Sequence, residues 1–427
     1  MRPCDRRSFL KALGGLSLPA WFPRLAFTTA AGRAARPAAQ RDLLVCIFQR
    51  GAADGLNTIV PVGDSGYYGN RPTIGIPEPA APATGGATSG TAIDLDGFFA
   101  LHPALGPLKP FYDDRTLAAV HAAGSPDPTH SHFQAMDYME RGTPGSQALS
   151  TGWINRHLQA AAAAGDGDAS PFRAVGFGTL LQASLRGPVP ATALQSIADF
   201  HLRGNAGAVQ TFQASLASLY AGAAWLDAQG VETFNAIKAL AAANPLAYQP
   251  QHGAQYPDSD FGMAMRQVAQ LSRASLGLEV ACVDVGGWDT HHSEGGATGQ
   301  MARLLGDLAA GLAAFATDLG DGMRHVLVVT MSEFGRRVLE NASGGTDHGH
   351  GNSMLVLGGG VNGGRVYGNW PGLAPDQLAS PGDLQVTTDF RTVLAEIVDK
   401  RLLNSNLAAV FPGFQAPAYL GIVQTAA

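Results

Sequence analysis

Apolar runs that alternate with helical patterns constrain the fold of this 427-residue chain more than any other feature. Continuous apolar runs of strand length occupy residues 42–48, 116–122, 278–285, 325–331 and 353–357, with a weaker run at 174–177. Helical spacing of apolar residues occurs at 101–112, 129–141, 153–164, 260–275, 300–319 and 388–403. Apolar strands separated by helices predict an α/β fold, with a mainly parallel central sheet and helices on both of its faces.

Two stretches interrupt this alternation. Residues 180–275 carry few strand signals, and Ala-rich helical patterns fill 206–228 and 231–243. We interpret the region as a helical cap inserted into one α/β domain that spans residues 40–427. A second stretch, 64–97, is rich in Pro, Gly, Ser and Thr and predicts a surface loop.

The first 39 residues have the composition of an export signal. Basic residues precede and flank a modestly apolar stretch, and small residues follow it. The paired Arg6 and Arg7, followed by Phe9, Leu10 and Lys11, are similar to a twin-arginine signal. We expect cleavage between residues 31 and 39, passage through the twin-arginine translocase, and a periplasmic or extracellular product. No later run of about 18 apolar residues predicts an integral membrane segment.

The composition excludes several classes of protein. Charged residues make up 15% of the chain and the net charge is −6, which argues against a nucleic-acid-binding protein and a coiled coil. Three cysteines are too few for a disulfide scaffold. Cys4 leaves with the signal, and Cys46 and Cys282 each lie within an apolar strand-like run, so we expect two buried thiols.

Polar residues follow each clear strand. In an open parallel sheet, ligands bind beyond the carboxyl ends of the strands, so these loops are the candidate site. Asp54 follows the first strand and Ser131, between His130 and His132, follows the second. The loops after the third and fourth strands carry the remaining candidates, which are Asp289, His291, Glu333, Asp347, His348 and His350.

Imidazole and carboxylate groups at one sheet edge suit a divalent cation, which we expect to be Zn, Mn, Mg or Ca. Residues two apart in an extended chain point the same way, so Asp289 can act with His291 and His348 with His350. A single Asp-x-His pair is most often a turn or a surface pair. Four such loops at four strand ends favour a shared metal site.

Other residues of these loops are candidates for chemistry and substrate binding. Ser131 begins a predicted helix and is either an ordinary N-cap or a nucleophile favoured by the helix N-terminus and a metal; Thr129 is the neighbouring alternative. Arg50 and Arg336 either hold an anionic substrate or pair with nearby acids. Asn57 and His132 complete the candidate substrate-binding residues.

The motifs RGAADGLN, THSHFQAMDYME, GGWDTH, SEFGRR and GTDHGHG together resemble those of domain-of-unknown-function family 1501. The resemblance covers roughly residues 42–415. It implies twin-arginine export and a fold of the alkaline phosphatase/sulfatase-like superfamily. Members are often encoded beside a second exported family of unknown function, which suggests an exported partner. No family-wide substrate is implied.

The superfamily binds one or two divalent metals at its strand ends and uses a Ser, Thr or modified Cys as the nucleophile. By this resemblance Asp54 matches the first metal ligand, Ser131 the nucleophile, and Asp289 with His291 a further metal pair, although the superfamily spaces that pair by four residues. The Asp-His expected directly after a strand is missing. Either Glu333 replaces that Asp and His348 or His350 is the last ligand, or Asp347-His348 has moved onto a longer loop.

These observations lead to three functional hypotheses. The first is a metal-dependent hydrolase of a small-molecule or polymeric phosphate or sulfate ester, with Ser131 attacking in line. The second is a non-catalytic exported binding or assembly protein that keeps the metal for structure. The third is a metal-free hydrolase with a Ser-His-Asp triad.

Overall fold

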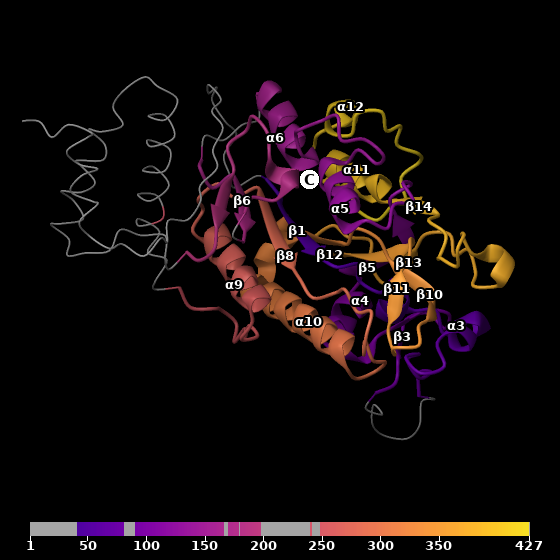
Figure 1. Ribbon diagram of the computed structural model, residues 1–427. Helices are drawn as coiled ribbons and strands as arrows, with labels where there is room; N and C mark the ends of the chain where they lie inside the picture. The colour runs from indigo at the N-terminus through magenta and orange to yellow at the C-terminus, as the bar shows by residue number, and fades with distance from the viewer. Residues whose placement is uncertain are drawn as a thin grey trace, which may run out of the picture.

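A computed structural model describes residues 41–80, 90–165, 170–178, 180–197, 240 and 248–426. These residues form three layers, with a central sheet between two layers of helices (Figure 1). The predicted α/β architecture with a mostly parallel sheet is therefore confirmed.

The central sheet has nine strands among the described residues. Their order from one edge is β13 (Val366–Tyr367), β5 (Leu117–Gly124), β12 (Asn352–Gly358), β9 (Val326–Met331), β1 (Leu43–Gln49), β8 (Val280–Val285), β6 (Ala174–Phe177) and β7 (Thr192–Leu194); β14 (Thr388–Asp389) also pairs with β5. Burial explains why they are continuously apolar, since every residue of β1, β5, β9 and β12 is buried.

Strand β12 runs against the others. It pairs antiparallel with both β5 and β9, whereas the remaining pairs in the sheet are parallel. The segment between β9 and β12 holds a hairpin of β10 (Arg336–Glu340) and β11 (Thr346–His348), with no crossover helix. A parallel return needs such a crossover, so the chain comes back antiparallel. The start of β12 thus lies at the carboxyl ends of its neighbours.

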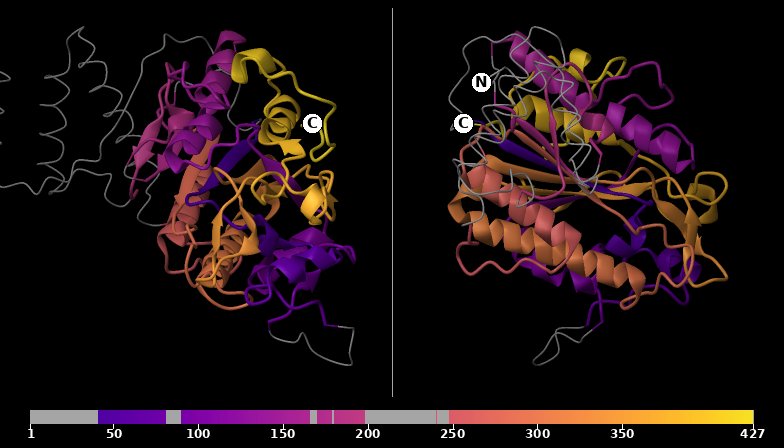
Figure 2. Two further views of the ribbon diagram at one scale, coloured as in Figure 1. Left: turned by 45° about the vertical axis from the view of Figure 1, so that its right-hand side comes forward. Right: turned by 60° about the vertical axis from the view of Figure 1, so that its left-hand side comes forward.

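Helices cover both faces of the sheet (Figure 2). One face carries α9 (Asp260–Arg273), α10 (Gln300–Leu319) and the 3₁₀ turn Pro103–Leu108 that leads into α4 (Lys109–Asp113). The other carries α5 (His132–Arg141), α6 (Trp153–Ala163), α11 (Phe390–Lys400) and α12 (Leu407–Val410). The expected closing helix is α11, and its N-cap is Asp389, which accepts the backbone N–H of Arg391.

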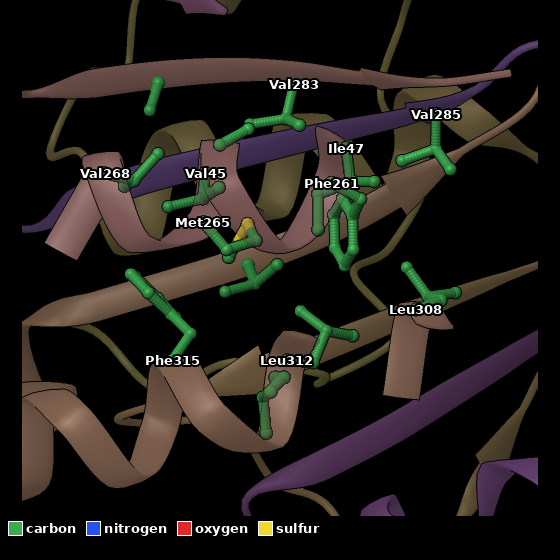
Figure 3. Packing of buried hydrophobic residues seen from close by; sticks show 14 of the residues in the cluster. Val45, Ile47, Phe261, Met265, Val268, Val283, Val285, Leu308, Leu312 and Phe315 are labelled. Carbon is green, nitrogen blue, oxygen red and sulfur yellow. The ribbon is translucent and has the colours of Figure 1, made fainter. Parts of the chain in front are cut away.

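Figure 3 shows how α9 and α10 pack on the strands. Alternate residues of β1 and β8 point toward these two helices, whose apolar side chains meet them at helical spacing. The labelled contacts are Val45, Ile47, Val283 and Val285 from the strands, Phe261, Met265 and Val268 from α9, and Leu308, Leu312 and Phe315 from α10. This packing fixes the strands whose ends carry the polar loops.

Smaller elements surround the sheet. The helices α2 (Gly55–Thr58) and α3 (Ser65–Asn70) follow β1, and β2 (Ile59–Val60), β4 (Ala100–Leu101) and β3 (Ile93–Asp94) form a second sheet. Short 3₁₀ turns occupy Ala183–Leu185, Gly320–His325 and Pro375–Gln377. The loop predicted over 64–97 therefore contains α3 and β3, and residues 81–89 of it lie outside the description.

Some predictions fall on residues that the structure does not describe. These are the signal at 1–39 and most of the helical cap; of the cap's described parts, β7 joins the sheet edge and α9 packs on its face. Within the described ranges, no helix is long and apolar enough to cross a membrane. Cys46 and Cys282 are buried free thiols, as expected, and they face each other in the β1–β8 register.

Candidate metal centre

Four imidazole and carboxylate side chains converge where the carboxyl ends of β5 and β8 meet the start of β12. His132 is the first residue of α5, Asp289 and His291 follow β8, and His348 ends β11. Among the described residues, the group of three or more His, Cys, Asp or Glu with ligand atoms within 4.8 Å of one another is His132, Asp289 and His348. His291 lies against the same group.

Neighbouring ligand atoms of this cluster lie 2.9–3.7 Å apart. The Nε2 atom of His348 is 3.0 Å from Nε2 of His132 and 2.9 Å from Nε2 of His291. Asp289 lies 3.2 Å from both His291 and His348, and 3.7 Å from His132. Four nitrogen or oxygen atoms arranged tetrahedrally around zinc at about 2.1 Å would be about 3.4 Å apart.

The second nitrogen of each ring is held by an acceptor. Nδ1 of His132 is 2.7 Å from Glu333, Nδ1 of His291 is 3.2 Å from Asp347, and Nδ1 of His348 is 3.1 Å from the carbonyl oxygen of His130. Ionised carboxylates and carbonyls only accept, so each Nδ1 donates a proton and each Nε2 of a neutral ring presents a lone pair. The Nε2 atom of His348 lies close to the Nε2 atoms of both other rings, an arrangement that suits a shared cation.

Burial and hydrogen bonds shift the pKa values of three groups at the site. Burial lowers the pKa of His348, which favours its neutral form. Burial alone would raise the pKa of Glu333, but hydrogen bonds from His132 and from the backbone N–H of Gly51 outweigh it and lower that pKa. Asp289 behaves in the same way, with Arg336 as the main opposing partner. The neutral form of His348 and the ionised forms of Glu333 and Asp289 are therefore favoured.

Ser131 lies at the N-cap of α5, immediately before His132, but its hydroxyl makes no capping hydrogen bond. Its backbone N–H donates to Thr129 Oγ1 at 3.2 Å, and its carbonyl accepts the N–H of Ala135. The Ser131 side chain is exposed to solvent. Ser131 is thus an N-cap by its backbone geometry, and its hydroxyl is not used for capping the helix.

The structure does not bring Asp54 to the cluster. Asp54 is fully buried and its carboxylate is bound by the guanidinium of Arg71, which lowers its pKa against the opposing effect of burial. Arg71 also donates to Asn57, which itself donates to the carbonyl of Ile74. Asp54 and Asn57 therefore form a buried polar network with Arg71 and lie apart from the four converging side chains.

The two arginines predicted to hold a substrate have protein partners. Arg50 donates to Glu140 at 3.0 Å and to Asp284 at 2.9 Å. Arg336 is 1% exposed, donates to Asp289 at 2.6 Å, and ties together the loops after β1, β8 and β10. It does so through the carbonyls of Gly51, Ala52, Trp288 and Thr346. Arg336 thus positions the loops of the cluster.

Three further predicted residues lie beside the cluster. Glu333 and Asp347 act through the rings of His132 and His291, as described above. His350 Nε2 is 2.7 Å from the carbonyl of Ser125. Of the two histidines predicted as the last ligand, His348 is the one that lies in the cluster.

The sequence predicts His132 as a substrate-binding residue, and the structure places it in the candidate metal cluster. A side chain in the first turn of a helix points back toward the helix N-terminus. His132 follows β5, so its side chain returns to the carboxyl edge of the sheet. The direction of side chains in the first turn of a helix was therefore the sequence signal that could have placed His132 at this edge. The Arg71 partner of Asp54 had no such signal, since it depends on long-range packing.

Comparisons with known proteins give a family and a weak structural similarity. The structure of alkaline phosphatase from the Antarctic bacterium TAB5 is similar over 77% of this chain and 95% of that chain, with 8% sequence identity and a TM-score of 0.26, too low to support a functional argument. No curated protein matches the sequence. The family model described as "Protein of unknown function (DUF1501)" matches residues 115–406, so the chain belongs to that family.

Proposed function

We propose that this protein is an exported, metal-dependent hydrolase of phosphate or sulfate esters. The observation that carries the proposal is the cluster of His132, Asp289 and His348, with His291 against it and every Nδ1 held by an acceptor. Acceptors that orient ligand rings are typical of functional metal sites. A donor set of imidazoles with one carboxylate fits Zn best, with Mn, Mg and Ca less well matched.

The residues suggest a division of roles. A bound divalent cation supplies Lewis-acid polarisation of the ester oxygen. Ser131 attacks phosphorus or sulfur, and a bond to its Oγ forms as the bond to the alcohol oxygen breaks. The hydroxyl proton of Ser131 passes to the departing alcohol oxygen. The N-terminus of α5 favours negative charge at this position. Water then releases the acid from Ser131.

Elemental analysis and a substrate screen test this proposal together. We expect about one metal ion per chain, and hydrolysis of aryl phosphates or sulfates that chelation abolishes. Asp289→Ala should lose both metal and activity. Ser131→Ala should keep the metal and lose activity by at least about 100-fold, while Thr129→Ala keeps both. Metal without any turnover would instead support the binding or assembly protein with a structural metal.

One observation favours the metal-free hydrolase as the second candidate. His130 precedes Ser131 and its Nε2 is 2.9 Å from the buried carboxylate of Asp383, as in an oriented His-Asp pair. Full activity after complete chelation, lost in His130→Ala, would establish this candidate and exclude the first.

Export is part of the proposal. Residues 1–39 would direct the folded chain to the twin-arginine translocase, and the mature domain would work in the periplasm or outside the cell. A second exported protein would be its partner.

A further inference from the structure

A hollow of about 620 Å³ lies beside the candidate metal centre. It is lined by α3, by β10 and the residue after it, by Asp347 of β11, and by the segment between residues 373 and 382. Figure 1 shows α3, β10 and β11 lying together at the end of the sheet. Pockets for small ligands have volumes of about 300–1,000 Å³.

Asp347 links the hollow to the candidate metal centre. Asp347 lines the hollow and lies 3.2 Å from Nδ1 of His291, whose Nε2 faces the cluster. The side chains of Asp289, His291 and Asp347 are 49%, 33% and 60% exposed, so all three are open to solvent beside it. A substrate whose ester group reached the metal would place its other end in the hollow.

The charge of the lining restricts what that end can be. Asp64, Glu340 and Asp347 line the hollow against one cation, Arg337, which itself lies 3.8 Å from Asp383. Asp64 is bonded by the N–H groups of Gly66 and Trp370, and Glu340 by Thr73 and Ile74, all neutral donors.

Glu340 remains ionised, since backbone N–H groups of Thr73 and Ile74 lower its pKa against the effect of burial. Asp347 is 60% exposed at the other end of the lining. The lining therefore carries an excess of negative charge, which repels anions and favours cations. Leu339, Leu373 and Leu378 add apolar surface.

We propose that the hollow binds the alcohol part of the substrate, and that it selects esters whose alcohol part carries no second negative charge. This inference rests on the proposed ester hydrolase. It excludes substrates such as sugar bisphosphates or phosphoglycerates, and it favours uncharged or cationic alcohols attached to the single phosphate or sulfate group.

Gly69 offers a way to fill the hollow without disturbing its walls. A Cβ atom built on Gly69 meets nothing within 4 Å, and Gly69 lines the hollow. Gly69→Trp should therefore project a large side chain into it. Gly322→Trp is the matched control, since a Cβ there makes only an ordinary contact of 3.8 Å with Leu319.

Calorimetry with the zinc-loaded full-length protein tests the inference by binding alone. The probes are phosphocholine, 3-phosphoglycerate and inorganic phosphate. We expect phosphocholine to bind at least 10-fold more tightly than 3-phosphoglycerate. Gly69→Trp should weaken phosphocholine at least 10-fold and inorganic phosphate less than 2-fold, with no change in Gly322→Trp.

Three results would overturn the inference: no binding of phosphocholine, equal binding of 3-phosphoglycerate, or equal weakening of all probes by Gly69→Trp. The proposed hydrolase fails separately. If the expected binding pattern holds but the wild-type protein hydrolyses no phosphate or sulfate ester, the subsite stands and catalysis does not.

Discussion

Glu333 lies behind His132 and fixes the direction of its ring. Its carboxylate accepts from His132 Nδ1 at 2.7 Å and from the N–H of Gly51 at 2.8 Å, in a fully buried position. Glu333→Gln keeps the shape of the side chain but removes the negative charge that makes the His132 ring a stronger metal ligand. We expect about 10–100-fold weaker zinc affinity by competition with a chelator. The exposed Glu78→Gln is the control, and equal affinities in both variants would rule out the positioning role.

His121, also buried, is a neutral histidine outside the cluster. Its Nε2 is 2.9 Å from the carbonyl of Ile59, and its Nδ1 accepts the N–H of Ala122 at 2.8 Å. Burial lowers its pKa to about 4, below the unfolded value of 6.5. The unfolded state therefore binds the extra proton first, so stability is complete above pH 6.5 and is lost as pH falls toward 4.

The size of this effect can be measured. Between pH 7 and pH 5, His121 should cost the metal-free protein about 2 kcal/mol of unfolding free energy. Urea titrations of wild type and His121→Gln at both pH values test this. The variant is expected to be less stable at pH 7 but to lose about 2 kcal/mol less on acidification. If wild type and His121→Gln lose the same unfolding free energy between pH 7 and pH 5, the prediction is wrong.

The β10–β11 hairpin sets the position of His348 at the scale of the element. A Cβ on Gly349 would lie 2.3 Å from the carbonyl carbon of Arg336. The backbone segments at Gly349 and Arg336 are therefore too close together for any side chain at position 349. Gly349→Ala should push β11 away from β10, lower stability by about 1–3 kcal/mol, and weaken zinc binding at least 10-fold. Gly106→Ala, whose nearest contact is 3.5 Å, should bind zinc as wild type does; an equal loss would point to a general effect.

Local sequence patterns could predict part of the fold. The apolar runs at 42–48, 278–285 and 325–331 became β1, β8 and β9, because buried parallel strands are apolar throughout. The polar loops that follow these strands lie at one edge of the sheet, because the three strands are parallel. The reversal of β12 and the pairing of Asp54 with Arg71 did not follow from the sequence, since both depend on tertiary packing across the molecule.

The whole molecule must fold before its candidate metal centre is assembled. The converging rings of His132 and His348 lie 216 residues apart in the chain, so an unfolded chain presents no such site. A transport route that carries folded proteins lets the ion bind before export, and the paired Arg6 and Arg7 are the sequence feature that predicts this route. A variant that is not exported should therefore still bind the metal, and one experiment can measure both its location and its metal content.

Replacing both arginines by lysine, Arg6→Lys with Arg7→Lys, should block export without changing the site. We expect the variant to accumulate in the cytoplasm as a full-length chain with the same metal content as the shortened periplasmic wild type. Cell fractionation, N-terminal sequencing and elemental analysis measure the three quantities. Arg33→Lys with Arg36→Lys is the control and should be exported, because these residues lie outside the signal motif. Normal export of the Arg6/Arg7 variant, or export of a metal-free chain by wild type, would show that the folded, metal-bound protein is not what crosses the membrane.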